Sequence, residues 1–303
     1  MERCSLRLLW LAGLVLGSLL LPLRHAGAAA VGLPAPAIIV VSQTPSEPGL
    51  AGRQALERQL RQRFPHQEWR WAVLTAADPP PAAAGDQAPR LNLGQVLAEL
   101  KSAGVKGVAI QPLALVPGGD WEPQLAAATA NAGLKIAVGK PLLSSLPDRQ
   151  RFLAALAAAL ATGKDQAVLL IAEGSKTPAA LREYLALYTL LLGKGKEYRI
   201  FLGTVNALPE MKTALNAVHK AGVTAVTIVP LPTFLDGPIP PPVLAAAAQA
   251  QETLKAGNIG TIRLFQEGLG SIEAVAAMYV DHLAAALETL APKKPERKKR
   301  GQK

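Results

Sequence analysis

The sequence has very little cysteine and few aromatic residues. Cys4 is the only cysteine among 303 residues, aromatic residues make up 4% of the chain, and there are four histidines. One cysteine excludes both an intrachain disulfide framework and a multi-thiolate metal site. The sequence also contains no HExxH or CxxC motif, no paired-histidine spacing, and none of the GxGxxG, GxxxxGK[ST] or GxSxG motifs. Zinc hydrolases, dithiol oxidoreductases, dinucleotide-binding enzymes, P-loop NTPases and serine hydrolases of the α/β type are therefore set aside.

Acidic residues are also scarce, and the net charge of +10 is unevenly distributed. Residues 1–30 carry +2 and residues 291–303 carry +6, which leaves +2 for residues 31–290. A nearly neutral body is not typical of a surface that binds phosphates, so we expect no nucleic-acid partner. The basic segment 291–303 is interpreted as a solvated, disordered tail, and contact with anionic lipid or another polyanion is the alternative.

The N-terminal residues have the pattern of a secretory signal peptide. Arg3 and Arg7 precede an apolar run over residues 8–21, and small residues follow over 26–30. This order matches the charged, apolar and cleavage regions of a signal. The run is short for a membrane span, which needs about 20 residues, so an uncleaved anchor is the less favoured reading. We therefore expect a periplasmic protein that begins near Val31 and has no stable membrane span after cleavage.

The rest of the chain alternates buried strands with amphipathic helices and contains one internal repeat. Residues 100–120 (LKSAGVKGVAIQPLALVPGGD) and residues 218–238 (VHKAGVTAVTIVPLPTFLDGP) each show a helix end, an Ala-Gly-Val stop, a short apolar run and a proline. Glycine suits the left-handed position that closes a helix, and a continuous apolar run is typical of a strand buried on both faces. The pattern predicts an α/β protein with parallel sheets flanked by helices.

Further strands and helices are expected around the repeat. Apolar or alternating runs predict strands at residues 37–41, 68–73, 134–138, 167–172, 198–202 and 261–265. The Pro-rich segment 78–89 is predicted to be a loop, and Thr177-Pro178 to supply the N-cap and first residue of a helix. We expect two domains, residues 31–145 and 146–290, between the signal (1–30) and the tail (291–303).

Several segments resemble one known enzyme family. These are VKGVAIQPLALVPGGDW, IAVGKPLL, IAEGSKTPA, FLGTVNALPE and EGLGSIEAVAAMYVDHL, which occur in this order between residues 37 and 287. They are similar to segments of the anaerobic, class II sirohydrochlorin cobaltochelatases. The resemblance implies two pseudo-symmetric α/β domains with a tetrapyrrole cleft between them. It also implies Co²⁺ as the substrate metal, sirohydrochlorin as the partner molecule and no organic cofactor, and leaves a homo-oligomer open.

The resemblance also indicates where the site residues lie. The family has Gly-His-Gly, with a metal-binding histidine, where this sequence has Ala172-Glu173-Gly174. The family's acidic residue after Gly-Thr-Val is Asn206 here, its second metal histidine falls in residues 234–238, which contain Asp236, and a further histidine position is Ala114. We therefore expect Glu173 as the catalytic residue, and Glu173 and Asp236 as metal ligands.

Polar residues at two strand ends complete the predicted site. Gln43 and Thr44 follow the first strand, and Ser175 and Lys176 precede the helix that starts at Pro178. Together with Asn206 they are the predicted substrate-binding residues, because helix N-termini and basic side chains bind carboxylates. The alternative to a binding role is that Lys176 is a solvated loop residue.

The histidine replacement leaves two functions open. Glutamate binds divalent ions through oxygen and accepts protons, but at its ordinary pKa it is a weaker base than histidine. The protein is therefore expected to be either a cobaltochelatase that uses Glu173, or a catalytically impaired homologue that binds a tetrapyrrole or a metal in the periplasm.

Overall fold

The computed structural model describes residues 35–43, 50–74, 91–160, 163–232 and 239–291. The predicted signal peptide, the Pro-rich loop 78–89 and nearly all of the predicted tail lie outside these residues.

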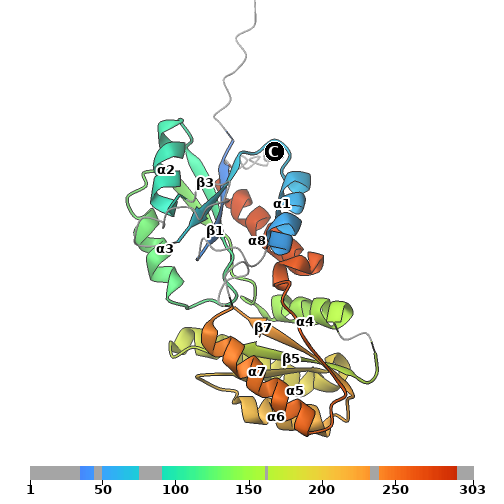
Figure 1. The fold of residues 1–303 in the computed structure, drawn as a ribbon. Coiled ribbons are helices and arrows are strands. Elements are labelled where there is room, and N and C mark those ends of the chain that lie inside the picture. Colours follow the sequence, from blue (N-terminus) through green and yellow to red (C-terminus); the bar gives the residue numbers. More distant parts are fainter. Residues whose placement is uncertain (1–34, 44–49, 75–90, 161–162, 233–238, 292–303) are drawn as a thin grey trace, which may run out of the picture. The chain divides into compact units, whose positions relative to one another are not determined.

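Two four-stranded parallel sheets form the framework (Figure 1). The first sheet has the order β2-β1-β3-β4 and the second the order β6-β5-β7-β8. The strands are β1 (Ala37–Ser42), β2 (Trp69–Val73), β3 (Gly107–Pro112), β4 (Lys135–Val138), β5 (Gln166–Ala172), β6 (Ile200–Thr204), β7 (Ala225–Leu231) and β8 (Thr261–Leu264). The identical strand order shows that one α/β unit is used twice, as the repeat predicts.

Helices connect the strands, as parallel pairing requires. They are α1 (Leu50–Arg63), α2 (Leu93–Ser102), α3 (Trp121–Thr129), α4 (Leu146–Leu160), α5 (Pro178–Tyr198), α6 (Met211–Lys220), α7 (Pro241–Ala256) and α8 (Glu273–Leu290), with a short 3₁₀ turn at Leu269–Ser271. The predicted α/β class with helix-flanked parallel sheets is confirmed.

The glycine stops of the repeat have the expected conformation. Gly104 and Gly222 have φ angles of 84° and 62°. After α2 the amides of Gly104 and Val105 donate to the carbonyl oxygens of Lys101 and Leu100. This pair of hydrogen bonds is a Schellman motif, which only a left-handed residue such as glycine forms without strain. Each stop ends a helix shortly before a buried strand.

The predicted strand at residues 198–202 is displaced in the structure. Helix α5 continues to Tyr198, so β6 begins only at Ile200. Arg199, with a φ angle of 50°, makes the left-handed turn between them. The start of this helix at Pro178 agrees with the prediction.

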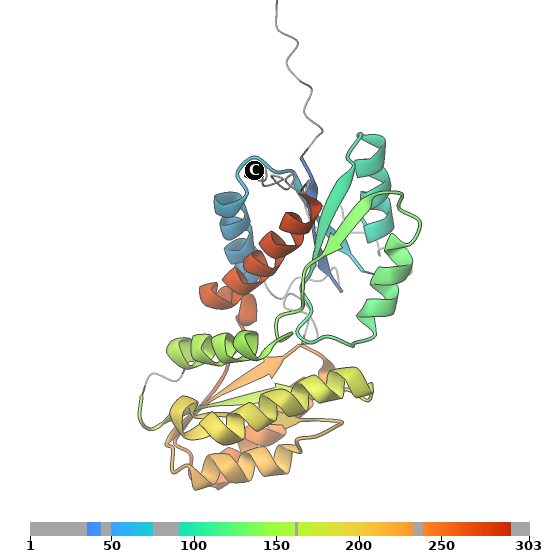
Figure 2. The same cartoon turned by 180° about the vertical axis from the view of Figure 1, so that it is seen from behind.

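The last helix packs against the first sheet, although it follows the second sheet in the sequence. Helix α8 contacts β3, β4 and α1, and Figures 1 and 2 show α8 beside α1 on the face opposite α2 and α3. Tyr279 of α8 is 1% exposed, and its hydroxyl lies 3.1 and 2.9 Å from the carbonyl oxygens of Leu113 and Ala114. The chain therefore returns to the first sheet, and the predicted domain boundary at residues 145 and 146 stays a prediction.

The second sheet is covered on both faces, which explains its continuous apolar strands. In β5, Val168 and Leu170 pack in the larger core with α4 and α5, whereas Leu169 and Ile171 pack in the smaller core with α6 and α7. Successive side chains of a strand point to opposite faces, so both sets must be apolar. Among the described residues, no helix combines the length and the apolar character that crossing a membrane requires.

Candidate functional site

A cavity of about 910 Å³ lies at the carboxyl ends of strands from both sheets. Gln43 directly follows β1, Glu173 directly follows β5 and Pro232 directly follows β7. Asn206 lies two residues after β6, and the loop after β3 adds residues up to Trp121. Ligands of open α/β sheets bind at this edge, where the strand ends and helix starts leave polar groups free.

Gln43 and Glu173 occupy equivalent positions in the two sheets. Strand β1 lies between β2 and β3, and β5 lies between β6 and β7. The chain therefore reverses its direction of winding beside each of these two strands, which marks the topological switch point of a sheet. The cavity extends from one switch point to the other, with the amide of Gln43 on one side and the carboxylate of Glu173 on the other.

The backbone after β5 is held by tight contacts that position Glu173. The amide of Asn206 donates to the carbonyl oxygen of Glu173 at 3.0 Å, and Gly174 has a φ angle of 85°. A Cβ atom on Gly174 would lie 2.8 Å from Cβ of Ala207. Only glycine fits this turn, so the backbone next to Glu173 is fixed.

Ser175 and Thr177 lie directly before α5. Their hydroxyl oxygens lie 2.9 Å apart, and the Ser175 hydroxyl accepts a hydrogen bond from the Thr177 amide at 3.2 Å. Thr177 Oγ1 also donates to the carbonyl oxygen of Gly118, at 2.8 Å. The helix start is thus fixed to the loop after β3, and these two segments form part of the cavity wall.

Five of the predicted site residues surround this one cavity: Gln43, Glu173, Ser175, Lys176 and Asn206. Glu173 is half-buried, whereas Lys176 and Asn206 are exposed at the cavity wall. Thr44 and Asp236, the other two, lie outside the described residues. The roles assigned to all seven residues stay predictions.

The cavity also contains residues that the sequence reasoning did not select. Asp120 lines it from the loop after β3, Trp121 from the first residue of α3, and Tyr184 from α5. Asp120 is exposed, whereas Trp121 and Tyr184 are each 4% exposed. The Gly-Gly-Asp-Trp sequence at residues 118–121 was a usable signal, because it follows a strand of the repeat. Tyr184 gave no signal, since an aromatic residue within an apolar helix is typical of core.

Tyr184 is a neutral polar group beside the carboxylate. Burial, and secondly the negative charge of Glu173, raise the pKa of the Tyr184 hydroxyl well above its ordinary value. Both effects disfavour the phenolate. Among the described residues no hydrogen bond to this hydroxyl is formed, so it can donate to a bound molecule.

The described histidines do not contribute to the cavity. His66 is exposed, and His219 packs close to Gly257. His282 Nδ1 lies 3.0 Å from the carbonyl oxygen of Lys140, and its Nε2 lies 3.1 Å from Oδ1 of Asp148. Among the described residues, no three His, Cys, Asp or Glu side chains are grouped so that they could hold a metal ion. A metal in this cavity would therefore have few protein ligands from the described part of the chain.

Two helix-flanked parallel sheets of identical order, with a polar cavity at their carboxyl edges, define a duplicated α/β protein. The model of the cobalt chelatase (CbiK) family matches residues 37–288. This match includes all eight strands, and the chain belongs to this family. The suspected family is thereby confirmed.

Individual relatives agree with this assignment. The chain is 27% identical over 244 residues to the sirohydrochlorin cobaltochelatase CbiKC of Nitratidesulfovibrio vulgaris strain Hildenborough, which covers 77% of this chain and 84% of the relative. The sirohydrochlorin chelatase SirB of Bacillus subtilis subspecies spizizenii, solved with cobalt, superposes with a TM-score of 0.57 at 16% identity, covering 84% of this chain and 96% of SirB.

A second solved structure gives the same fold. CbiX, described as the terminal enzyme of siroheme biosynthesis in denitrifying bacteria, matches with a TM-score of 0.50 at 20% identity, covering 83% of this chain and 99% of CbiX. At these identities the two structures support the fold of this protein.

Proposed function

We propose that this protein inserts Co²⁺ into sirohydrochlorin in the cavity that contains Glu173. The observation that carries the proposal is the position of Glu173: in a member of the cobalt chelatase family, a half-buried carboxylate lies at the switch point of the second sheet. The cavity of about 910 Å³ is within the range of sites that enclose a cofactor-sized molecule.

The reaction requires acceptors for two protons. When Co²⁺ enters the macrocycle, two pyrrole N–H bonds break, two cobalt–nitrogen bonds form in their place and two protons leave. Glu173 and Asp120 are the carboxylates among the described residues that line the cavity. Carboxylate oxygens accept protons and bind divalent cations reversibly, which suits a metal that must move on to the macrocycle.

The remaining polar groups suit a polycarboxylate substrate. Lys176 supplies a positive charge at the wall, and the start of α5 adds the positive end of a helix. Tyr184, kept neutral by its raised pKa, and Asn206 supply uncharged donors. Trp121 and Val116 offer an apolar surface for the face of the ring.

One observation favours a second candidate function, a tetrapyrrole-binding protein without turnover. Glu173 replaces the histidine that the resemblance places at this position, and no three-residue metal cluster exists among the described side chains. Such a protein would keep the cavity and bind the macrocycle but would not metallate it.

One assay separates the two functions. The purified protein is mixed with sirohydrochlorin and Co²⁺, and the absorbance spectrum is followed. A chelatase gives turnover above the metal-only control, Glu173→Gln lowers it at least about tenfold, and Glu173→His retains or raises it. Glu210→Gln, an exposed carboxylate outside the cavity, should behave as the native protein.

A spectral shift with no turnover selects the binding function. Absence of both turnover and a spectral shift, while a known chelatase works in parallel, would refute both functions.

We further propose that the protein is exported and acts in the periplasm after removal of residues 1–30. Support comes from the charged, apolar and small-residue order of this segment. Cell fractionation and N-terminal sequencing of the isolated protein test the proposal. A protein that retains residue 1 or fractionates with the cytosol would contradict it.

A further inference from the structure

A second cavity begins about one turn further along α5, at Tyr188 rather than Tyr184, and is built on the outer edge of the second sheet. It has a volume of about 560 Å³ and is enclosed by α5, β6 and α6. Its lining residues are Tyr188, Leu191, Leu192, Arg199, Ile200, Phe201, Leu202, Thr213, Ala214, Ala217, Lys220 and Ala221. We call it the edge groove.

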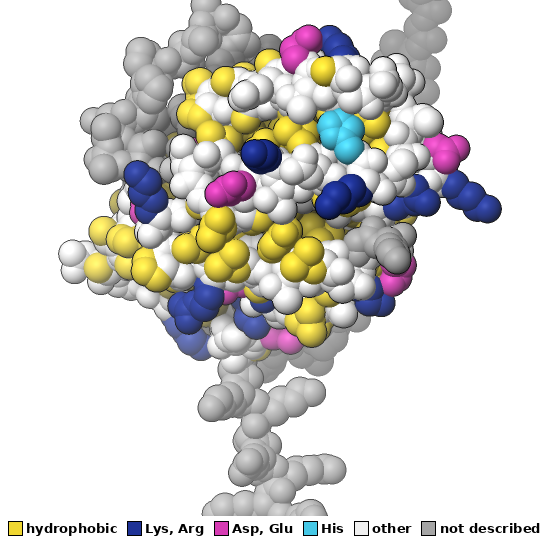
Figure 3. Space-filling view, turned by 90° about the horizontal axis from the view of Figure 1, so that it is seen from below, with side chains coloured by type: hydrophobic (Ala, Val, Ile, Leu, Met, Phe, Trp, Pro, Cys, Tyr) yellow, Lys and Arg dark blue, Asp and Glu magenta, His cyan; other side chains and the backbone are white. Residues whose placement is uncertain are grey.

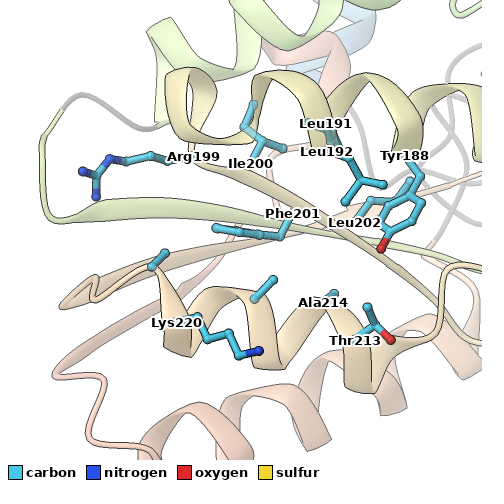
Figure 4. Close-up of a pocket in the computed structure, with 12 residues that line it drawn as sticks. Tyr188, Leu191, Leu192, Arg199, Ile200, Phe201, Leu202, Thr213, Ala214 and Lys220 are labelled. Carbon is cyan, nitrogen blue, oxygen red and sulfur yellow. The ribbon is translucent and has the colours of Figure 1, made fainter.

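The wall of the edge groove is apolar and partly open to solvent. Leu191 of α5 is 4% exposed, whereas Leu192 is 68% exposed, the largest value among the large hydrophobic residues that the structure describes as exposed. Figure 4 shows Phe201 between the two helices, with the small residues of α6 opposite it. Figure 3 shows hydrophobic side chains gathered on the underside of the molecule, with both basic and acidic side chains around them. An apolar surface of this kind next to an edge strand favours an occupant.

The polar groups of the edge groove lie toward its ends. In Figure 4 the Tyr188 hydroxyl points toward α6 on the side of Thr213, while Lys220 lies further along α6 and Arg199 projects from the start of β6. The apolar part of a bound molecule would thus lie between the hydroxyl groups of Tyr188 and Thr213 at one end and the basic side chains of Lys220 and Arg199 at the other.

The charges of the lining residues are all of one sign. Lys220 and Arg199 are the charged residues of the lining, which contains no Asp or Glu. Within the described part of the chain, neither side chain forms an ion pair or a hydrogen bond. An anionic group would therefore gain a favourable interaction without displacing an existing partner.

The positive charge of the edge groove determines which kind of molecule can bind there. The segment 291–303 of the chain is itself strongly basic, and a second copy placed symmetrically on the edge groove would bring two further cations to it. Either occupant would be repelled by the positive charges of Lys220 and Arg199. We propose that the edge groove binds a carboxylate with an apolar body, of the acyl-chain class, with the carboxylate at Lys220.

Calorimetric titration of the purified protein with decanoate, below its micelle concentration, tests this site. Saturable binding is expected, and decan-1-ol, which has the same chain length without the charge, should bind at least about tenfold more weakly. Lys220→Glu should weaken decanoate binding by about tenfold or more. Lys212→Glu, an exposed lysine on the same helix outside the lining, is the matched control and should stay within about twofold of the native affinity.

Leu192→Glu provides a second variant, because this exposed side chain can change without disturbing the core. It should also weaken decanoate binding, and circular dichroism checks that each variant folds. No saturable heat, equal affinity for decanoate and decan-1-ol, or equal losses in Lys220→Glu and Lys212→Glu would overturn the proposal. A dimer in sedimentation velocity that Leu192→Glu converts to a monomer would assign the groove to self-association instead and overturn it too.

These results do not depend on the proposed chelatase activity, because the two cavities share no lining residue. Cobalt insertion can be measured on the same variants and should remain at the native level.

Discussion

Thr177 Oγ1 donates a hydrogen bond of 2.8 Å to the carbonyl oxygen of Gly118, joining the start of α5 in the second half of the fold to the loop after β3 in the first. The contact is close enough that a Cβ atom on Gly118 would lie 2.2 Å from Cβ of Ala179. Gly118 has a φ angle of 75°, and its amide donates to Oε1 of Glu122. One wall of the larger cavity is therefore held by two residues that are 59 positions apart, with α3, β4, α4 and β5 between them.

Removal of this hydrogen bond should weaken the protein. Thr177→Val keeps the shape of the side chain but leaves the Gly118 carbonyl without its donor. We expect a loss of about 1–2 kcal/mol in the free energy of unfolding, measured by urea denaturation. Thr189→Val is the matched control, since Thr189 is exposed on the same helix and donates only to the Leu185 carbonyl. Equal losses in the two variants would show that the contact with Gly118 adds nothing.

Gly174 should tolerate no side chain. Gly174→Ala places a Cβ atom 2.8 Å from Ala207 at a φ angle of 85°, so we expect a loss of about 1–3 kcal/mol in unfolding free energy. In the same assay Gly193→Ala should be neutral or gain up to about 1 kcal/mol, because Gly193 lies within α5 with no atom within 4 Å of a Cβ. A neutral Gly174→Ala would mean that the turn after β5 adapts easily.

Tyr184 should make the protein sensitive to alkali. Its pKa is raised in the folded state, so its favourable contribution is present below the ordinary pKa of tyrosine, about 10, and falls as the pH rises further. In that range the unfolded chain releases the proton while the folded protein keeps it. We expect unfolding free energy to fall with pH more steeply in the native protein than in Tyr184→Phe, by up to about 1.4 kcal/mol per pH unit.

Urea denaturation of both proteins at pH 8 and at several values above pH 10 measures this difference. The comparison at pH 8 removes any effect of the missing hydroxyl itself. Parallel pH profiles above pH 10 would contradict the prediction.

Tyr279 should anchor α8 to the first sheet. Its buried hydroxyl lies within hydrogen-bond distance of the Leu113 and Ala114 carbonyl oxygens, and the Ala114 oxygen also accepts from the Leu142 amide. Tyr279→Phe should therefore cost about 1–2 kcal/mol in unfolding free energy, measured with urea. Tyr188→Phe, a half-buried tyrosine in the edge groove, should change it by less than about 0.5 kcal/mol. A Tyr279→Phe variant as stable as the native protein would refute an anchoring role.

Local patterns predicted the elements of this fold well where a chemical cause acts over a few residues. Gly104 and Gly222 end helices because glycine accepts positive φ angles, and Pro178 starts a helix because the missing amide is not needed there. The misplaced strand at residues 198–202 shows the limit. Helix α5 runs to Tyr198, and Arg199 then makes the left-handed turn, a conformation that is rare for a residue other than glycine and that the residue type does not reveal.

The site was predicted only in part for a similar reason. Glu173 and Gln43 could be predicted as site residues because each directly follows an apolar strand, and the carboxyl ends of parallel strands lie at one edge of a sheet. Asp120 and Tyr184 reach the same cavity from a loop and a helix face. Their positions depend on the packing of distant segments, which no short pattern encodes.

The sequence by itself determined the alternation of strands and helices and the duplicated unit, because both rest on side-chain periodicity. It also determined the likeness to the chelatases, because five of its segments resemble segments of that family. Only the tertiary structure decided that α8 covers the first sheet, that Thr177 meets Gly118, and that α5 and α6 leave a basic apolar groove beside β6. Periodicity shows which face of a helix is apolar, whereas the surface that covers this face is selected by the packing of the whole chain.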